Sequence, residues 1–168
     1  TGTTTISEGL LTLSGSKTGT GLVTVGSNGE LRVYGTMNGR INAAAGSRMY
    51  VAGTLGGPVY LAAASVSAPG ARLAGNGKVT GSLVAGTNAV VSPSDSSVIG
   101  TFMVEGDLTM NGAIYEAQVS GGSTAKSDKL AVTGTLTVAG RLLLKQLNTT
   151  PLIEGNTFQL FTAGSIKG

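Results

Sequence analysis

Apolar residues alternate with polar or small residues along most of this chain, and glycines interrupt the alternation at regular positions. One copy of the pattern runs from Leu31 to Ile41, a second from Met49 to Val59 and a third from Leu73 to Leu83. Alternation with a period of two is typical of β-strands, in which successive side chains point to opposite faces. The pattern therefore predicts many short strands and no long helix.

The same pattern continues to the end of the chain. Two longer copies run from Phe102 to Ile114 and from Leu130 to Leu142, and weaker copies open at Leu11 and Leu160. The copies begin 20, 18, 24, 29, 28 and 30 residues apart. A repeat of this length is typical of a solenoid, in which each unit buries its apolar face against its neighbours.

The repeated glycines predict how each unit bends. Glycine weakens an isolated strand, but a position without a Cβ lets stacked units turn at the same place. The copies align two glycine columns, the first Gly35, Gly53, Gly77, Gly106 and Gly134, the second Gly39, Gly57, Gly81, Gly112 and Gly140. Two bends and a loop give three short sheets, so we predict an all-β, right-handed parallel β-helix of about six or seven coils. The handedness follows from the bias of parallel crossovers.

The alignment also predicts which side chains stack. Three interior columns are wholly apolar, namely Leu31, Met49, Leu73, Phe102 and Leu130; Met37, Leu55, Val79, Leu108 and Leu136; and Ile41, Val59, Leu83, Ile114 and Leu142. Burial of each large aliphatic side chain contributes roughly 1.5–3 kcal/mol. On the outside, Lys78 aligns with Asp107, which predicts an exposed ion pair worth about 0–1 kcal/mol. Turn-forming residues at 92–97, 121–127 and 148–155 predict loops at one corner.

Composition narrows the class of protein. The 168 residues include 28 glycines, and 40% hydrophobic residues placed in register can build a core, unlike a disordered chain. The 11 basic residues are scattered, which argues against nucleic-acid binding. There is no cysteine or histidine, and no apolar stretch approaches the roughly 20 residues of a membrane span. We expect residues 1–168 to be a single β-helix fragment of a larger protein, with short Gly/Ala-rich coils over residues 1–88.

The second half carries a more specific signature. The runs 92–112, 127–140 and 155–163 resemble the autotransporter-associated β-strand repeat, also called the passenger-associated transport repeat. The resemblance covers about residues 89–168. It implies a right-handed parallel β-helix within the secreted passenger of a bacterial surface protein, where the segment helps the rest of the passenger to fold. It also implies an extracellular location, at the bacterial cell surface.

Candidate catalytic residues are few. Among the eight acidic residues, the repeat brings only Glu105 and Asp107 close together on one outward face. Paired carboxylates serve acid–base chemistry in polysaccharide-cleaving enzymes, but a solvated face with one ion pair is the simpler interpretation. No histidine is present to activate a serine. We therefore expect no enzyme activity, no catalytic residue, no metal site and no cofactor.

Two functions remain as hypotheses. The first is a structural stalk and folding scaffold of a bacterial surface protein, in contact with neighbouring coils of the same polypeptide. The alternative is a carbohydrate-binding or polysaccharide-cleaving module, because Arg32, Tyr34, Arg48 and Tyr50 fall on outward positions of adjacent repeats. Aromatic rings beside arginines can stack on and hydrogen-bond a sugar chain, so surface glycans are the expected partner of that face.

The C-terminal repeat is expected to self-associate. Phe158, Leu160 and Phe161 lie close together, and Lys167 is the only charged residue after them. An open apolar edge with few charges tends to pair with another chain. The N-terminal repeat, rich in threonine and glycine, should associate less.

Overall fold

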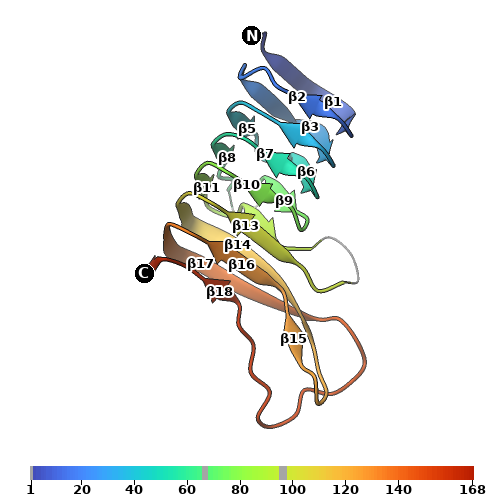
Figure 1. Ribbon diagram of the computed structural model, residues 1–168, viewed down its shortest axis with the longest axis vertical. Coiled ribbons are helices and arrows are strands. Elements are labelled where there is room, and N and C mark those ends of the chain that lie inside the picture. Colours follow the sequence, from blue (N-terminus) through green and yellow to red (C-terminus); the bar gives the residue numbers. More distant parts are fainter. Residues whose placement is uncertain (1, 66–67, 95–97) are drawn as a thin grey trace.

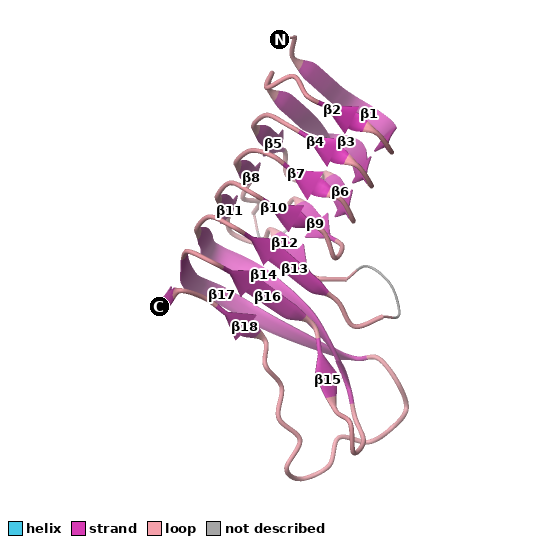
Figure 2. Ribbon diagram, in the orientation of Figure 1, coloured by secondary structure: helices cyan, strands magenta, loops and turns pink. Residues whose placement is uncertain are grey.

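The computed structural model describes residues 2–65, 68–94 and 98–168, and these residues form strands, turns and loops with no helix (Figure 2). The strands are β1 (Thr4–Leu13), β2 (Ser16–Lys17), β3 (Val23–Val33), β4 (Thr36–Met37), β5 (Ile41–Ala43), β6 (Arg48–Val51), β7 (Thr54–Leu55), β8 (Val59–Leu61), β9 (Arg72–Ala74), β10 (Lys78–Val79), β11 (Leu83–Ala85), β12 (Val90–Ser92), β13 (Thr101–Val104), β14 (Leu108–Ser120), β15 (Lys126–Ser127), β16 (Lys129–Val132), β17 (Thr135–Gln146), β18 (Phe161–Thr162) and β19 (Ser165–Lys167).

The strands form two sheets. In the 12-stranded sheet the main order is β11-β8-β5-β3-β6-β9-β12-β14-β17-β19, with β1 on β3 and β15 on β14. The 7-stranded sheet has the order β18-β16-β13-β10-β7-β4-β2. Only β15 pairs antiparallel; every other described ladder joins a strand to the corresponding strand of a neighbouring repeat in parallel. The prediction of an all-β chain is therefore correct.

The prediction of a right-handed parallel β-helix solenoid is wrong. Strand β11 pairs with β8 on one side and with β14 on the other, so the order β11-β8-β5-β3-β6-β9-β12-β14 closes on itself. The hydrogen-bonded ladders thus form a closed parallel ring of eight strands, a β-barrel, with the 7-stranded sheet as a second ladder. Figure 1 shows the repeats following one another from β1 to β17.

Two long strands close the ring. Residues 23–25 of β3 pair with β5 while residues 30–33 pair with β6. In the same way, residues 108–110 of β14 pair with β11 and residues 114–115 pair with β12. The repeats between them are divided by turns instead, in which the Ser47 N–H donates to the Ala44 carbonyl at 3.1 Å and the Ala89 N–H to the Gly86 carbonyl at 3.0 Å. Alternation alone does not distinguish a strand that runs on from one that stops at a turn.

The predicted columns are correct for the first three copies and displaced for the last two. The pairings join Leu31, Met49, Leu73, Val91 and Tyr115 in the first; Met37, Leu55, Val79, Val104 and Val132 in the second; and Ile41, Val59, Leu83, Leu108 and Leu136 in the third. Phe102 and Leu130 lie instead on the 7-stranded sheet, where they pair with each other. In the last two copies, each residue therefore lies one sheet further along the repeat than the alignment had placed it.

Glycines at one corner explain this shift. A Cβ on Gly57 would lie 2.5 Å from the Gly39 carbonyl oxygen, one on Gly106 2.9 Å from the Gly81 oxygen, and one on Gly134 2.8 Å from the Gly106 oxygen. Gly106 and Gly134 thus belong to the second glycine column, which the alignment had given to Gly112 and Gly140. The first column contains Gly35, Gly53 and Gly77, and in later repeats a loop takes its place.

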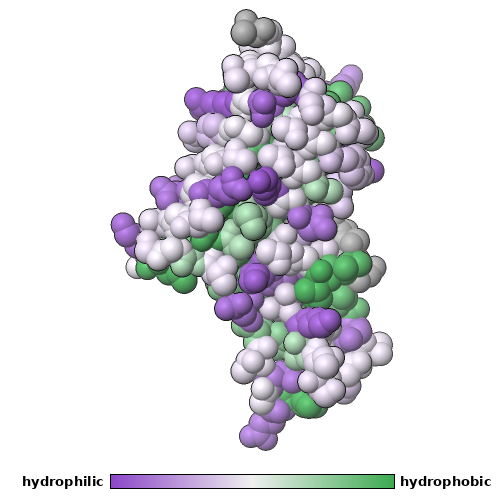
Figure 3. All heavy atoms as spheres, viewed as in Figure 1, coloured by the Kyte–Doolittle hydropathy of each residue, from purple (hydrophilic) through white to green (hydrophobic). Residues whose placement is uncertain are grey.

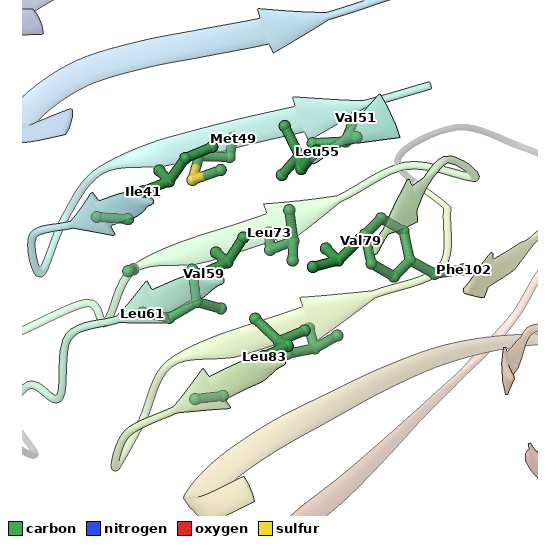
Figure 4. Close-up of a cluster of buried hydrophobic side chains, with 14 of the residues drawn as sticks. Ile41, Met49, Val51, Leu55, Val59, Leu61, Leu73, Val79, Leu83 and Phe102 are labelled. Carbon is green, nitrogen blue, oxygen red and sulfur yellow. The ribbon is translucent and has the colours of Figure 1, made fainter. Parts of the chain in front are cut away.

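The core is one continuous cluster. Side chains of successive repeats meet in the interior, as Figure 4 shows for Ile41, Val59 and Leu83. It contains Ile6, Val23, Val25, Leu31, Val33, Met37, Ile41, Ala43, Met49, Val51, Leu55, Val59, Leu61, Ala71, Leu73, Val79, Leu83, Ala85, Ala89, Val91, Phe102, Val104, Leu108, Met110, Ala113, Tyr115, Ala117, Leu130, Val132 and Leu136. The surface shown in Figure 3 is mostly of intermediate hydropathy, with hydrophilic residues in small groups.

The long connections lie at the corner between the two sheets. Between β12 and β13 the described connecting residues are 93–94 and 98–100. The segment 121–128 with β15 joins β14 to β16, and residues 147–160 join β17 to β18. The predicted loop at 92–97 lies partly outside the described residues. Buried Asp128 holds this corner, because its carboxylate accepts the Gly100 N–H at 2.7 Å and the Gln118 N–H at 2.8 Å.

The predicted ion pair of Lys78 has a different partner. Lys78 lies opposite Met103, and its Nζ is 2.8 Å from the Glu105 carboxylate rather than near Asp107. Asp107 accepts a hydrogen bond from the Thr135 N–H at 2.7 Å. The displacement of the last two copies accounts for the change of partner.

We expect Gly57→Ala to lower the free energy of unfolding by about 1–3 kcal/mol, because its Cβ would overlap the backbone of the preceding repeat and force the repeats apart. The matched control is Gly19→Ala, whose Cβ would meet nothing within 4 Å. Urea denaturation monitored by circular dichroism measures both. Equal stability of the two variants would show that the glycine corner is not under steric constraint.

The C-terminal end of the stack exposes an apolar edge. From Gly140 to Gln146, β17 pairs with β14, and its pairing with β19 is confined to residues 135–137. Leu142 and Leu144 lie opposite the buried Tyr115 and Ala117, yet they are 49% and 48% exposed. The exposed apolar surface is thus centred on β17 rather than on Phe158, Leu160 and Phe161, which are partly buried.

Self-association should depend on this edge. The double variant Leu142→Lys with Leu144→Lys should shift the chain toward monomer at high concentration, because two lysines on the exposed edge of β17 would repel the same edge of a second copy. Leu10→Lys, on β1 at the other end of the stack, is the control and should leave the mass unchanged. Size-exclusion chromatography with light scattering measures both. A chain that is already monomeric at high concentration would contradict the prediction.

Candidate functional site

The residues predicted to bind glycans lie together on β3 and β6 and just beyond β3. Arg32 lies opposite Tyr50, and Arg48 lies opposite Glu30. The rings of Tyr34 and Tyr50 are in contact, with centroids 5.8 Å apart. The Glu30 carboxylate turns toward Arg32, 2.6 Å from its Nε, and this hydrogen bond and charge raise the pKa of Arg32. The pairings of Arg32 with Tyr50 and of Arg48 with Glu30 are therefore those that the alignment predicted, and glycan binding by these residues stays a prediction.

Beside these residues lies a surface groove that we call the arginine groove. It consists of two adjoining depressions of about 340 and 330 Å³ that share Arg48 and Arg72. The first is lined by Arg32, Tyr50 and Lys145, among others, and the second reaches Arg141. Arg32, Arg48 and Tyr50 thus line the groove, whereas Tyr34 does not.

The arginine groove follows one outward row of the 12-stranded sheet. Arg48 lies opposite Arg72, Arg72 opposite Val90, Val90 opposite Ile114 and Ile114 opposite Arg141. Val90 and Ile114 are half-buried and form an apolar strip between the arginines. Like charges directly opposite on neighbouring strands destabilise a sheet, so the Arg48–Arg72 pairing needs compensation.

Part of that compensation comes from Glu116. Its carboxylate is 2.7 Å from Arg72 Nη2 and 2.8 Å from Lys145 Nζ, and the residue is only 6% exposed. Burial alone would raise the pKa of Glu116, but the hydrogen bonds and charges of Arg72 and Lys145 outweigh it, so the pKa is lowered. Glu116 therefore acts as a fixed anion beneath the groove.

Arg48 and Arg141 are not compensated in this way. In the described part of the chain, neither guanidinium is within ion-pair distance of a carboxylate, and both residues are exposed. Arg141 donates from Nη2 to the Asn88 Oδ1 at 3.1 Å, and Asn88 occupies the left-handed backbone region at φ 60°. The groove therefore offers two guanidiniums to a ligand.

Three further acidic residues, Glu105, Asp107 and Asp128, also have structural partners. Burial raises the pKa of Asp128 against the opposing hydrogen bonds from the Gly100 and Gln118 amides. Burial and the nearby Asp128 charge raise the pKa of Tyr115, whose hydroxyl oxygen lies 3.2 Å from the carbonyl oxygens of Asp128 and Leu160 and can donate its one proton to either. Glu105 pairs with Lys78 and Asp107 caps Thr135, as described above. Within residues 2–65, 68–94 and 98–168, no three His, Cys, Asp or Glu side chains gather as metal ligands.

Sequence reasoning missed part of the groove. Arg72 could have been found, since it precedes Leu73 as Arg48 precedes Met49, and the alignment already paired these leucine and methionine positions. Arg141, Lys145 and Glu116 could not, because the last two copies were aligned one face away from their true positions. Their contribution appears only when the pairing of β14 with β17 is known.

Comparisons with known proteins add no relative. No family model matches this chain, and neither the search of curated proteins nor the search of solved structures finds a match. Among the described residues, no helix is long and apolar enough to cross a membrane.

The pKa of Glu116 predicts a pH dependence. Its folded pKa is lowered from 4.5, so its stabilising contribution is present above that pH and is lost as pH falls through the folded pKa. We expect Glu116→Gln to lower the free energy of unfolding at pH 7 by about 1.5–3 kcal/mol, with the deficit shrinking as the pH falls below 4.5 and through the lower folded pKa. Urea denaturation at several pH values measures this.

The control is Glu105→Gln, which removes the exposed pair with Lys78 and should cost about 0–1 kcal/mol. A Glu116→Gln deficit that does not change with pH would contradict the assignment of Glu116 as the anion of the pair.

Proposed function

We propose that this chain is a non-enzymatic structural segment of a bacterial surface protein, acting as a stalk and folding scaffold. The observation that carries the proposal is the single continuous core from Ile6 to Leu136. Apolar side chains from successive repeats join this one core, so the repeats hold one another in place along the chain. Such a stack can hold other parts of the polypeptide away from the cell.

The location rests on the resemblance of residues 89–168 to autotransporter-associated repeats. The parallel β-helix that this resemblance implies is corrected above, so the resemblance supports only the role and the location. The exposed apolar edge of β17 is consistent with the role, because an edge of this kind can pair with another part of a polypeptide or with a second chain.

Glycan binding is the second candidate function. It is favoured by the cluster of Arg32, Tyr34, Arg48 and Tyr50, in which two tyrosine rings in contact lie beside two guanidiniums. Aromatic faces and planar cationic donors are the groups with which proteins bind sugars. This candidate and the scaffold can coexist, because the cluster lies on the outer face of the core.

An assay for polysaccharide cleavage tests the proposal that this segment is not an enzyme. We expect the purified chain to release no new reducing ends and no unsaturated uronates from polygalacturonate, alginate or chondroitin, because the carboxylates of Glu105, Asp107, Glu116 and Asp128 are held in ion pairs and backbone hydrogen bonds. A reducing-sugar assay and absorbance of unsaturated products measure this against a blank without protein. Turnover that is lost in Glu116→Gln or Glu105→Gln would overturn the proposal.

A further inference from the structure

We propose that the arginine groove binds an acidic oligosaccharide, one that carries carboxylates or sulfates on its sugars. The inference rests on the second candidate function, glycan binding, and adds to it the charge and the position of the ligand. The evidence for it is the row of residues from Arg48 to Arg141 rather than the contact between Tyr34 and Tyr50.

The arginine groove is lined by more basic than acidic side chains. The described residues that line the groove include Arg32, Arg48, Arg72, Arg141 and Lys145, opposed by Glu30 there and by Glu116 beneath it. The Glu30 carboxylate forms an ion pair with Arg32, and the Glu116 carboxylate forms ion pairs with Arg72 and Lys145. Among the described lining residues, Arg48 and Arg141 carry charges without an ion-pair partner, so the groove favours an anionic ligand. A guanidinium prefers planar, bidentate anions such as carboxylate and sulfate.

The floor of the groove between these arginines is apolar at its centre. Arg48 and Arg141 stand four strand spacings apart on one row, roughly 19 Å between their backbones. Val90 and Ile114 lie between them and offer an apolar surface. The C–H faces of sugar rings pack on such a surface, and a chain of a few sugars spans the distance between the two guanidiniums.

The lining of the groove suits a sugar chain better than a nucleic acid. Binding of nucleic acid depends on many cations along a backbone and on aromatic rings that stack bases. Here two available guanidiniums flank an aliphatic strip, and Tyr50 is the one aromatic residue among the described lining residues. These features favour a ligand with separated anionic groups and apolar ring faces.

The experiment measures the affinity of the chain for matched ligands by isothermal titration calorimetry at low salt. The probes are a tetrasaccharide of galacturonate, a sulfated tetrasaccharide, a neutral tetrasaccharide and a tetranucleotide of single-stranded DNA. We expect the galacturonate or the sulfated probe to bind, more weakly as salt rises, and the neutral probe and the tetranucleotide to bind at least tenfold more weakly. The better of the two acidic probes identifies which anion the groove takes.

Variants locate the ligand. Arg48→Ala and Arg141→Ala should each weaken binding of the acidic probe by about tenfold, since each removes a charge-assisted hydrogen bond. Arg40→Ala is the matched control, because Arg40 is exposed and stacks 4.4 Å above the Tyr60 ring outside the groove. It should leave the affinity for the acidic probe unchanged. Thermal melts confirm that each variant is folded.

Four results would overturn the inference: no binding of either acidic probe at millimolar concentration, equal binding of the neutral probe, equal or tighter binding of the tetranucleotide, or equal weakening by Arg40→Ala. Neutral binding that is lost in Tyr34→Ala would refute the acidic groove while supporting the second candidate function. The scaffold proposal is tested separately by the cleavage assay.

Discussion

The close approach of backbones at one corner is the constraint on which the rest of this structure depends. Along the second glycine column the chain of one repeat passes so near the previous one that a single added carbon would overlap a carbonyl group, as at Gly57 against Gly39. The repeats can stack at strand spacing on both sides of the corner only because side chains are absent there. That spacing in turn sets the register by which Ile41, Val59 and Leu83 meet in the core. A glycine here is thus a packing residue, although it contributes no surface to bury.

The same register builds the arginine groove. Inward positions of β6 and β9 are apolar because they face the core, and the outward positions between them are free to carry charge. Parallel in-register pairing places equivalent residues of successive repeats side by side, so Arg48 and Arg72 must be neighbours once Met49 and Leu73 are. The fold therefore concentrates charge that the sequence scatters. Glu116 balances part of it from beneath, because β14 passes close enough for its carboxylate to reach Arg72.

The parts that could be predicted from sequence are those that depend on local pattern. Alternation predicted the strands, and the spacing of the first three copies, which open at Leu31, Met49 and Leu73, predicted the columns through Leu73, Val79 and Leu83. The same alignment failed at Phe102, because a loop replaced the first glycine corner and the next glycine, Gly106, looked like the missing one. The closed ring could not be predicted either. It depends on whether β3 and β14 continue through Gly29 and Gly112, and continuation is decided by pairing with neighbouring strands rather than by the residues themselves.

Scaffold and binding surface make different demands on the same repeat, and the structure separates them by face. Stability comes from inward side chains and the glycine corners, where Leu55 or Gly57 has little freedom to change. Outward residues such as Arg48 and Tyr50 contribute little to the core, so they can vary without unfolding the stack. The like charges of Arg48 and Arg72 are therefore informative. Nothing in the core requires two arginines there, and their juxtaposition has an electrostatic cost that an anionic ligand would remove.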